Sequence, residues 1–266
     1  MIDNPRSPRV RAVAKLAKRA AREETGLFLV EGPQALREAL AFHPELLVDV
    51  FAAKGVFDRH PELARGLASA GIEPEHVSDA VLEAMADTVT PQGVVAVARQ
   101  FPVTIKDLLE RGARLVAILE EVRDPGNAGT IIRAADAAGA DGVILTGKSV
   151  DAYNPKVVRS TTGSIFHLPL AQGGTLEHAL HLVRGAGMQV FAADISGDEL
   201  PTLRERLPEP TAWLFGNEAR GLDDDALALV DLSLRLPIFG RAESLNLATA
   251  ASVCLYESAF AQRLSH

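Results

Sequence analysis

The sequence predicts an α/β protein whose second half forms a mostly parallel sheet, preceded by a smaller α/β domain. From Arg114 onward, short apolar runs rich in β-branched residues alternate with helical patterns, which is typical of a parallel sheet with helices on its faces. The length of 266 residues also exceeds the ~100–200 residues of an ordinary domain. We therefore expect two domains, each with its own core.

The first half has its own alternation of strands and helices. The expected strands are 27–31, 47–53 and 93–99, and the expected helices are 34–42, 61–70 and 79–86. This unit ends near Phe101-Pro102, and the polar segment that follows is expected to be helical and to connect the two halves. The predicted domains are 1–102, a linker helix over 103–113, and a second domain over 114–266.

A basic segment near the N-terminus is the clearest cluster of positive charge. The net charge of −8 argues against a general polyanion binder, yet residues 4–22 hold seven Lys or Arg and no Asp or Glu. If residues 10–22 form one helix, five cations share a face by their spacing: Arg11, Lys15, Lys18, Arg19 and Arg22. This face is either simply solvated or an RNA-binding surface.

Composition excludes several classes of protein. With 47% hydrophobic and 23% charged residues, the chain is ordinary globular material. Its apolar runs are far shorter than the ~20 residues that cross a bilayer, and none follows the N-terminal arginines, so we expect a cytoplasmic protein. Cys254 is the only cysteine, which excludes disulfides and cysteine-based zinc sites, and we expect it to be a small buried side chain.

Three loops of the second half are where chemistry is expected. The predicted strands there are 115–119, 142–146, 189–192, 212–215 and 232–236. Parallel sheets bind ligands beyond the carboxyl ends of their strands, which directs attention to the loops beginning at Glu120, Phe215 and Pro237.

The first loop leads into a helix over 130–138. Its Asp-Pro-Gly-Asn turn starts that helix, and Asn127 could serve only as a cap. Arg133 lies on the helix among small and apolar residues, where it is either an ordinary surface arginine or a functional group.

The second and third loops are polar and close to helix starts. Gly216 and Gly221 bracket the second, which permits close approach of a ligand to the backbone. The chain has no G-x-G-x-x-G and no Walker lysine pattern, which argues against NAD and ATP. In the third loop Ser244 could be a helix N-cap, whereas Asn246 would lie in the first helical turn, where asparagine has no advantage. A polar ligand is one explanation for Asn246.

Taken in order, the three loops resemble the motifs of the SpoU-type (TrmH-type) RNA ribose methyltransferases of the SPOUT superfamily. The first motif has an asparagine followed by glycine and arginine at fixed spacing, matched by Asn127, Gly129 and Arg133. The second, Gly-Asn-Glu-x-x-Gly-Leu, matches 216–222, and the third, Ile-Pro-Met-x-Gly followed by Ser-Leu-Asn, matches 236–246.

The resemblance spans about 115–257, and it has three departures. Leu236 and Ile238 replace the usual isoleucine and methionine but keep apolar bulk, whereas Ala248 replaces a frequent serine and removes a hydroxyl. The front half, with Phe-Leu-Val-Glu-Gly at 28–32, resembles the small substrate-binding domain of many members.

The resemblance implies a trefoil knot whose loops bind S-adenosylmethionine, a homodimer, and two sets of site residues. The catalytic set is Arg133, Asn127, Glu218, Ser244 and Asn246. The cofactor set, acting mainly through backbone groups, is Leu214, Gly216, Leu236, Ile238 and Leu245. The front domain, with its basic helix, would bind structured RNA through phosphate and shape contacts.

Methyl transfer from a sulfonium needs neither a metal nor a phosphate cradle, but a ribose hydroxyl must be positioned and polarised. The resemblance assigns this step to Arg133, often as the base. Because an arginine pKa lies above ~12, a guanidinium that binds the RNA phosphate and stabilises the developing alkoxide is the physically favoured role.

The expected function is therefore S-adenosylmethionine-dependent methylation of a ribose 2′-hydroxyl, in 23S ribosomal RNA rather than tRNA because the front domain resembles that of ribosomal members. The alternatives are a tRNA ribose methyltransferase, a base methyltransferase of the same superfamily, and a catalytically inactive RNA-binding protein. The last predicts a damaged motif, whereas all five predicted catalytic residues are present.

Overall fold

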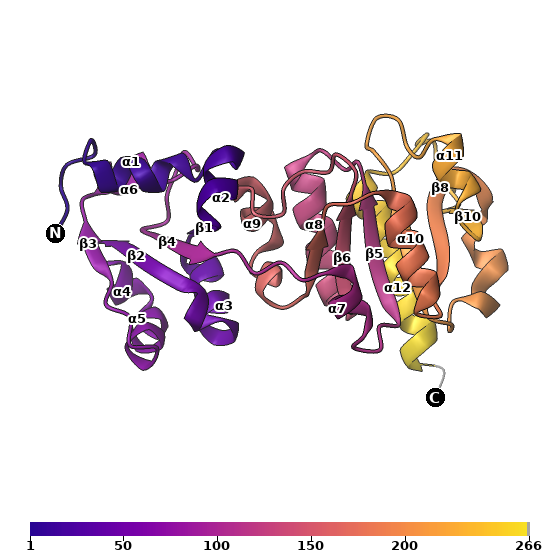
Figure 1. Cartoon of the computed structure of the whole chain (residues 1–266), viewed down its shortest axis with the longest axis horizontal. Helices are drawn as coiled ribbons and strands as arrows, with labels where there is room; N and C mark the ends of the chain where they lie inside the picture. Colours follow the sequence, from indigo (N-terminus) through magenta and orange to yellow (C-terminus); the bar gives the residue numbers. More distant parts are fainter. Residues whose placement is uncertain (265–266) are drawn as a thin grey trace. The chain divides into compact units, whose positions relative to one another are not determined.

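The computed structural model describes residues 1–264 and divides the chain into two compact units (Figure 1). The first unit comprises Met1–Phe101 together with Tyr153–His167, and the second comprises Pro102–Ala152 together with the chain from Leu168 onward. The segment Tyr153–His167 thus packs with the first unit, although it lies inside the predicted second domain over 114–266.

The first unit is built on a four-stranded sheet in the order β1-β4-β2-β3. Its strands are β1 (Leu27–Glu31), β2 (Leu47–Ala53), β3 (Glu75–Val77) and β4 (Val94–Arg99). Its helices are α1 (Pro8–Lys15), α2 (Arg19–Thr25), α3 (Pro33–Phe42), α4 (Val56–Arg59), α5 (Pro61–Ser69), α6 (Asp79–Met85) and α9 (Pro155–Thr161), with single 3-10 turns at Pro44–Leu46 and Ser164–Phe166. β4 runs antiparallel to both β1 and β2, while β2 and β3 are parallel. The three predicted strands and three predicted helices are confirmed, and β3 was not predicted.

The segment Tyr153–His167 belongs to the first unit because its aromatic residues complete that unit's core. The Tyr153 ring lies 4.9 Å from the ring of Phe28 on β1, and the Tyr153 hydroxyl accepts a hydrogen bond from the Phe101 N–H at 2.9 Å. Phe166 stacks on Phe101 at 5.9 Å. Aromatic pairs at these separations contribute beyond the burial of their area.

The predicted single basic helix is two helices, and Arg22 is not on its surface. The chain breaks between α1 and α2, where the buried Leu16 ends the first helix. The Arg22 side chain is 1% exposed and donates to the carbonyl oxygens of Leu16 and Ala17 at 2.8 and 2.9 Å. These carbonyls at the helix end need a donor, which Arg22 supplies, so the expectation that Arg22 shares the exposed basic face is wrong.

The second unit is built on a six-stranded parallel sheet in the order β10-β8-β9-β5-β6-β7. Its strands are β5 (Leu115–Glu120), β6 (Gly142–Thr146), β7 (Leu170–Gln172), β8 (Gln189–Glu199), β9 (Thr211–Phe215) and β10 (Leu232–Arg235). Its helices are α7 (Ile105–Leu109), α8 (Pro125–Ala138), α10 (Leu176–Gly185), α11 (Asp224–Ala228) and α12 (Leu247–Leu264), with a 3-10 segment at Leu200–Arg206. The predicted parallel α/β fold is confirmed, and the trefoil knot stays a prediction.

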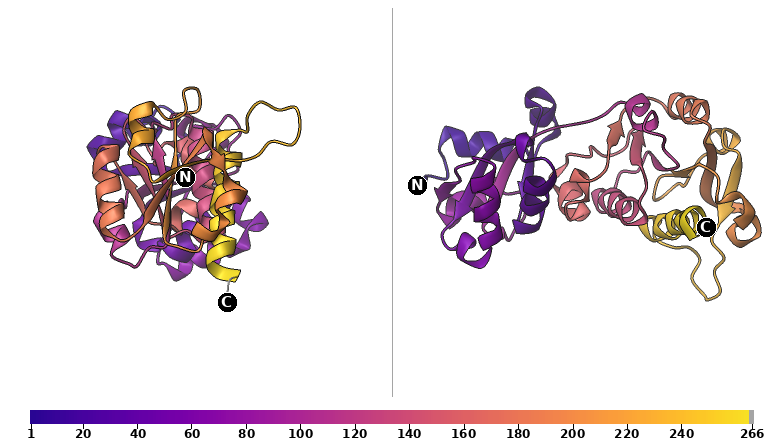
Figure 2. Two further views of the ribbon diagram at one scale, coloured as in Figure 1. Left: turned by 90° about the vertical axis from the view of Figure 1, so that its right-hand side faces the viewer. Right: turned by 90° about the horizontal axis from the view of Figure 1, so that it is seen from below.

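Helices cover both faces of this sheet, as Figure 2 shows. Apolar residues of α7, α10 and α11 form one core cluster with alternate strand residues such as Val116 and Leu214. On the other face α12 runs along α8, where the Tyr256 hydroxyl donates to the Ala137 carbonyl at 3.3 Å. The helix expected over 103–113 is shorter in the structure, where α7 covers only Ile105–Leu109. This helix belongs to the core of the second unit, because Ile105, Leu108 and Leu109 are buried there.

Cys254 on α12 is 1% exposed, as predicted, and burial raises the pKa of its thiol to about 12. In the described part of the chain, no helix combines the length and apolarity needed to span a membrane. Residues 1–264 also hold no group of three or more His, Cys, Asp or Glu side chains placed to share a metal ion.

Candidate active site at the carboxyl edge of the parallel sheet

The first two predicted loops leave the sheet side by side. β5 and β9 are neighbouring parallel strands, and Leu119 is paired with Phe215 at their carboxyl ends. The chain therefore enters both loops, at Glu120 and Gly216, from adjacent positions. This register explains why two segments almost a hundred residues apart in sequence form one site.

Glu218 joins the second loop to the first. Its carboxylate accepts a hydrogen bond from the Arg123 N–H at 3.2 Å and from the Asp124 N–H at 2.9 Å. Asp124 is the N-cap of α8 and accepts the Asn127 N–H at 2.8 Å. Free N–H groups and positive partial charge gather at a helix N-terminus, so an anionic side chain is stabilised there. Glu218 thus fixes where α8 begins relative to β9.

Asn217 makes a second connection and shapes its own loop. Its amide donates to the Glu121 carbonyl at 2.9 Å, and its Oδ1 accepts the N–H groups of Ala219 and Arg220 at 3.0 and 3.2 Å. The loop closes tightly, because a Cβ at Gly216 would lie 2.7 Å from the Gly221 backbone. Glycine is therefore required at 216 by space alone.

Asn246 joins the third loop to the first, and it is the residue that caps α12. Its Nδ2 donates to Asn127 Oδ1 at 3.0 Å, while its Oδ1 accepts the N–H groups of Ala248 and Thr249 at 2.9 and 3.2 Å. The expectation that Asn246 lies inside the first turn is wrong, because α12 begins at Leu247. Ser244 lies two residues before the cap, is exposed, and does not cap this helix.

Arg133 is not brought together with the other predicted catalytic residues. It is exposed on α8, six residues after Asn127 and so about 9 Å further along the helix axis. Among residues 1–264 its guanidinium has no hydrogen-bond or ion-pair partner. Asn127, Glu218 and Asn246, by contrast, are connected directly or through α8's first turn. The chain described thus leaves the Arg133 guanidinium available to an external group.

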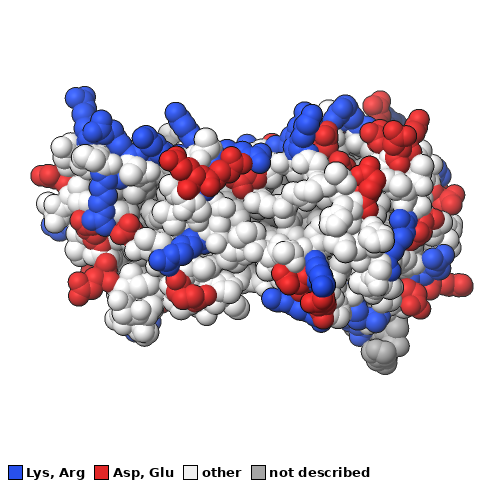
Figure 3. All heavy atoms as spheres, viewed as in Figure 1, with Lys and Arg blue, Asp and Glu red and all other residues white. Residues whose placement is uncertain are grey.

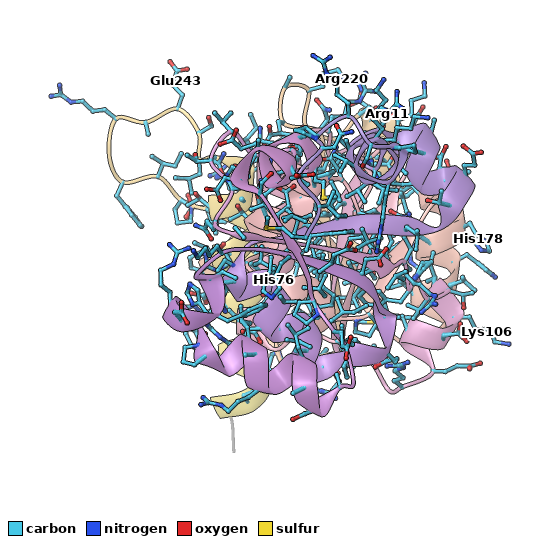
Figure 4. The ribbon with its side chains drawn as sticks, turned by 90° about the vertical axis from the view of Figure 1, so that its left-hand side faces the viewer. Arg11, His76, Lys106, His178, Arg220 and Glu243 are labelled. Atoms are coloured by element: carbon cyan, nitrogen blue, oxygen red, sulfur yellow. The ribbon has the colours of Figure 1, made fainter. Side chains whose placement is uncertain are left out.

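Four of the predicted cofactor residues lie on two of these loops, and Leu214 lies on β9. The Leu214 side chain is buried in the core, so only its backbone can contact a ligand. Ile238 and Leu245 are 38% and 42% exposed on the segment 236–246, which projects from the unit in Figure 4 near the labelled Glu243. Within the described chain, the backbone groups of 237–245 have no hydrogen-bond partner. Apolar side chains next to free backbone donors and acceptors fit an adenosine-like ligand.

Sequence reasoning missed a charged cluster beside the first loop. The Glu121 carboxylate pairs with Arg123 at 3.0 Å and with Arg220 at 2.6 Å, and the Glu121 backbone is left-handed at φ 52°. Next to it, burial raises the pKa of Glu120, although a hydrogen bond from the Thr146 hydroxyl opposes this. In the sequence, the run Glu-Glu-x-Arg at 120–123 was the pattern that could have indicated this charged cluster.

The parallel sheet and the three connected loops at its carboxyl edge define the protein as an α/β enzyme with its site at that edge. The chain belongs to the SpoU rRNA Methylase family, whose model matches residues 114–256. A second model, the MRM3-like substrate binding domain, matches residues 7–96. The resemblance to SpoU-type methyltransferases is therefore confirmed. The resemblance of the front half to a substrate-binding domain is confirmed as well.

Relatives and solved structures match over almost the whole chain. The 23S rRNA (guanosine(2553)-2′-O)-methyltransferase RlmP of Bacillus subtilis (strain 168) is 32% identical over 96% of this chain and 97% of its own. The SpoU methyltransferase AviRb from Streptomyces viridochromogenes in complex with AdoMet is 31% identical, with a TM-score of 0.83, over 98% of this chain and 100% of its own. The AdoMet-bound rRNA methyltransferase from Sinorhizobium meliloti is 30% identical, with a TM-score of 0.81, over 97% of this chain and 96% of its own.

Proposed function

We propose that this protein transfers the methyl group of S-adenosylmethionine to a ribose 2′-hydroxyl of 23S ribosomal RNA. The observation that carries the proposal is the set of connections by which Glu218 and Asn246 join three loops at one sheet edge. The names of full-length relatives, one acting on 23S rRNA at a guanosine 2′-oxygen, support the substrate. A cytoplasmic location remains a prediction.

S-adenosylmethionine would lie against Gly216 and the segment 236–246, where backbone groups are free and Ile238 and Leu245 are partly exposed. The bound cofactor supplies an activated methyl group. The protein's own contribution is to hold the ribose oxygen in line with that group, which lowers the barrier because the reacting atoms are already oriented. The connections between the loops keep this geometry fixed.

Arg133 would bind the RNA phosphate next to the reacting ribose and stabilise negative charge on the 2′-oxygen. Its guanidinium has no partner among the described residues, and a planar, permanently charged group suits bidentate contact with a phosphate. As the 2′-oxygen takes the methyl group, its proton passes to solvent water, and the guanidinium favours that loss by stabilising the negative charge that develops on the oxygen.

The protein would act as a homodimer through α8 and α12. Val253, Tyr256 and Phe260 of α12 are 39%, 37% and 54% exposed at a spacing that places them along one side of the helix. Ala137 of α8, which Tyr256 contacts, is four residues from Arg133. A second copy covering this apolar face would therefore lie next to Arg133. Tyr256→Asp should give monomers in light scattering and a large loss of activity.

The decisive experiment maps ribose methylation in RNA from cells with and without the protein. One 23S position should lose its methyl group when the protein is absent, and purified protein with S-adenosylmethionine should restore it. A 2′-deoxy nucleotide at that position should abolish transfer. Restoration on tRNA instead would favour the tRNA enzyme, and RNA binding without any transfer would favour an inactive binding protein.

A further inference from the structure

A cavity of about 300 Å³ lies in the first unit, and none of the residues that line it belongs to the loops just described. It is bounded by the end of β1, the start of α3, residues within 88–92, the start of β4, and Arg159 of α9 with the C-cap Thr162. None of the predicted catalytic, cofactor or basic residues lines it. Its volume is at the small end of the ~300–1,000 Å³ range for small-molecule sites, which suits one small planar group.

An ion-pair network centred on the buried Glu31 builds one wall of the cavity. The Glu31 side chain is only 4% exposed, and it pairs with Arg159 at 2.9 Å. The other arm of Arg159 pairs with Asp87 at 2.9 Å. Glu31 also accepts the N–H groups of Asp87 and Thr88 at 3.4 and 3.2 Å. These bonds hold Asp87 and Thr88 against the end of β1, so this part of the wall is fixed before any ligand arrives.

The charges of this network disfavour an anion in the cavity. Two carboxylates face a single guanidinium, and both arms of that guanidinium are already engaged. A phosphate would therefore meet net negative charge and no free cation. The phosphate-binding residues proposed for this unit, Arg11, Lys15 and Lys18, lie elsewhere, on α1 and at the N-cap of α2.

The groups that remain available are neutral donors and acceptors. In the part of the chain that the structure describes, the side chains of Thr88, Thr90 and Gln92 line the cavity without any hydrogen-bond partner. The N–H groups of Gln34 and Ala35 are in the first turn of α3, where they have no intrahelical acceptor, and the N-cap Gly32 offers no side chain. Pro91 and Val94 add apolar surface.

Gly32 allows the Gln92 side chain to lie close to the turn between β1 and α3. Its φ is +91°, and a Cβ there would lie 2.9 Å from Oε1 of Gln92. The Gln92 amide thus rests against the strand-to-helix turn, which only glycine permits. A primary amide presents a donor and an acceptor side by side, the pattern that pairs with the edge of a nucleobase.

We propose that this cavity takes one unpaired nucleobase of the RNA substrate, at a nucleotide other than the one that is methylated. The inference rests on the proposed function. Only a base that is unstacked and unpaired can present its hydrogen-bonding edge to such a site, which is how proteins read RNA sequence. The cavity would then choose the RNA, while α1 supplies phosphate contacts that are independent of sequence.

The test compares RNA binding by the full-length protein and a Thr90→Val/Gln92→Leu double variant, with Ser69→Ala, an exposed hydroxyl on α5 outside the cavity, as the matched control. A 23S rRNA fragment is the ligand, and affinity is measured directly, so the result does not depend on turnover. We expect the Kd of the double variant to rise about tenfold, as for the loss of a few neutral hydrogen bonds. Its salt dependence and its affinity for S-adenosylmethionine should match wild type.

An abasic scan of the same fragment then identifies the base. Removing one particular unpaired base should weaken wild-type binding about tenfold and should leave the double variant almost unaffected, because that variant has already lost the contact. Equal Kd values for wild type and double variant, or additive effects at every abasic position, would overturn the cavity proposal. Methylation of 23S rRNA by the double variant at saturating RNA would show that the proposed function stands regardless.

Discussion

The Asn246 side chain donates to Asn127 Oδ1 at 3.0 Å with one atom and caps α12 with the other. A single side chain therefore stabilises a helix and connects two loops of the site. The two roles use different atoms, so substitutions can separate them.

Asn246→Ser should keep the cap and lose the connection. Serine is as good an N-cap as asparagine, but it is too short to reach Asn127. We expect unfolding free energy within about 0.5 kcal/mol of wild type and clearly reduced methyl transfer. Asn246→Ala, the control, should lose both roles and about 1 kcal/mol of stability. Denaturant unfolding and initial rates measure the two effects, and full activity in the serine variant would contradict the connection's importance.

The alternation of strands and helices was predictable because it depends on local hydrophobic period. β1 and β2 begin and end at the predicted residues, since apolar runs bounded by turn residues mark them clearly. β3 and β7 were missed because each has only three residues, too few for a period to show. The placement of Tyr153–His167 with the first unit depends on contacts between segments far apart in sequence, which no local pattern reports.

The bonds among the predicted site residues could not be inferred from the sequence. Motif spacing selected Asn127, Glu218 and Asn246, whereas their connections follow from the β5–β9 register and the start of α12. Arg22 shows the converse error. Charge spacing placed it with Arg11 and Lys15, but the break after Leu16 turned it inward to satisfy carbonyl groups.

The basic surface of the first unit predicts a salt-dependent contact with RNA. Figure 3 shows Lys and Arg side chains along the edge where α1 and α2 lie, and Arg11 is labelled in Figure 4. Arg11, Lys15 and Lys18 are exposed, whereas Arg19 is paired with Glu23 at 2.7 Å. Changing the first three to glutamine should weaken RNA binding and lower the salt slope by about 2–3, with cofactor affinity unchanged.

Arg22→Gln provides the contrast for that experiment. Because the Arg22 side chain is buried and bonded to two carbonyls, its loss should lower stability by about 1–3 kcal/mol. The salt slope of RNA binding should not change. If the triple variant kept the wild-type slope, the surface of α1 would be a solvated face without a ligand.

The raised pKa of Glu120 predicts that the free energy of unfolding depends on pH. Burial raises its pKa in the folded protein, so the ionised carboxylate costs stability at neutral pH, and that cost disappears as the pH falls through the raised pKa. Glu120→Gln keeps an acceptor for Thr146 and should be more stable than wild type at pH 7, with the difference shrinking toward acid pH. Thermal unfolding across pH 3 to 8 measures this.

Glu177→Gln should change the pH dependence of stability in the opposite direction. A hydrogen bond from the backbone lowers the pKa of Glu177, so its ionised form contributes stability at neutral pH that is lost as the pH falls through the lowered pKa. This variant should be no more stable than wild type at pH 7. A Glu120→Gln variant that followed the same trend would show that the Glu120 carboxylate is not penalised by burial.

Arg133 is the residue at which positioning and chemistry can be told apart. Its side chain is exposed and has no partner among the described residues, so Arg133→Ala should leave folding and cofactor affinity near wild type. If the guanidinium acts in the transition state, turnover should fall by about 10²–10³. Arg133→Lys keeps a charge but loses the planar fork, so partial activity there indicates electrostatic stabilisation of the 2′-oxygen. A fully active Arg133→Ala would remove this residue from the mechanism and leave the connected loops alone to account for catalysis.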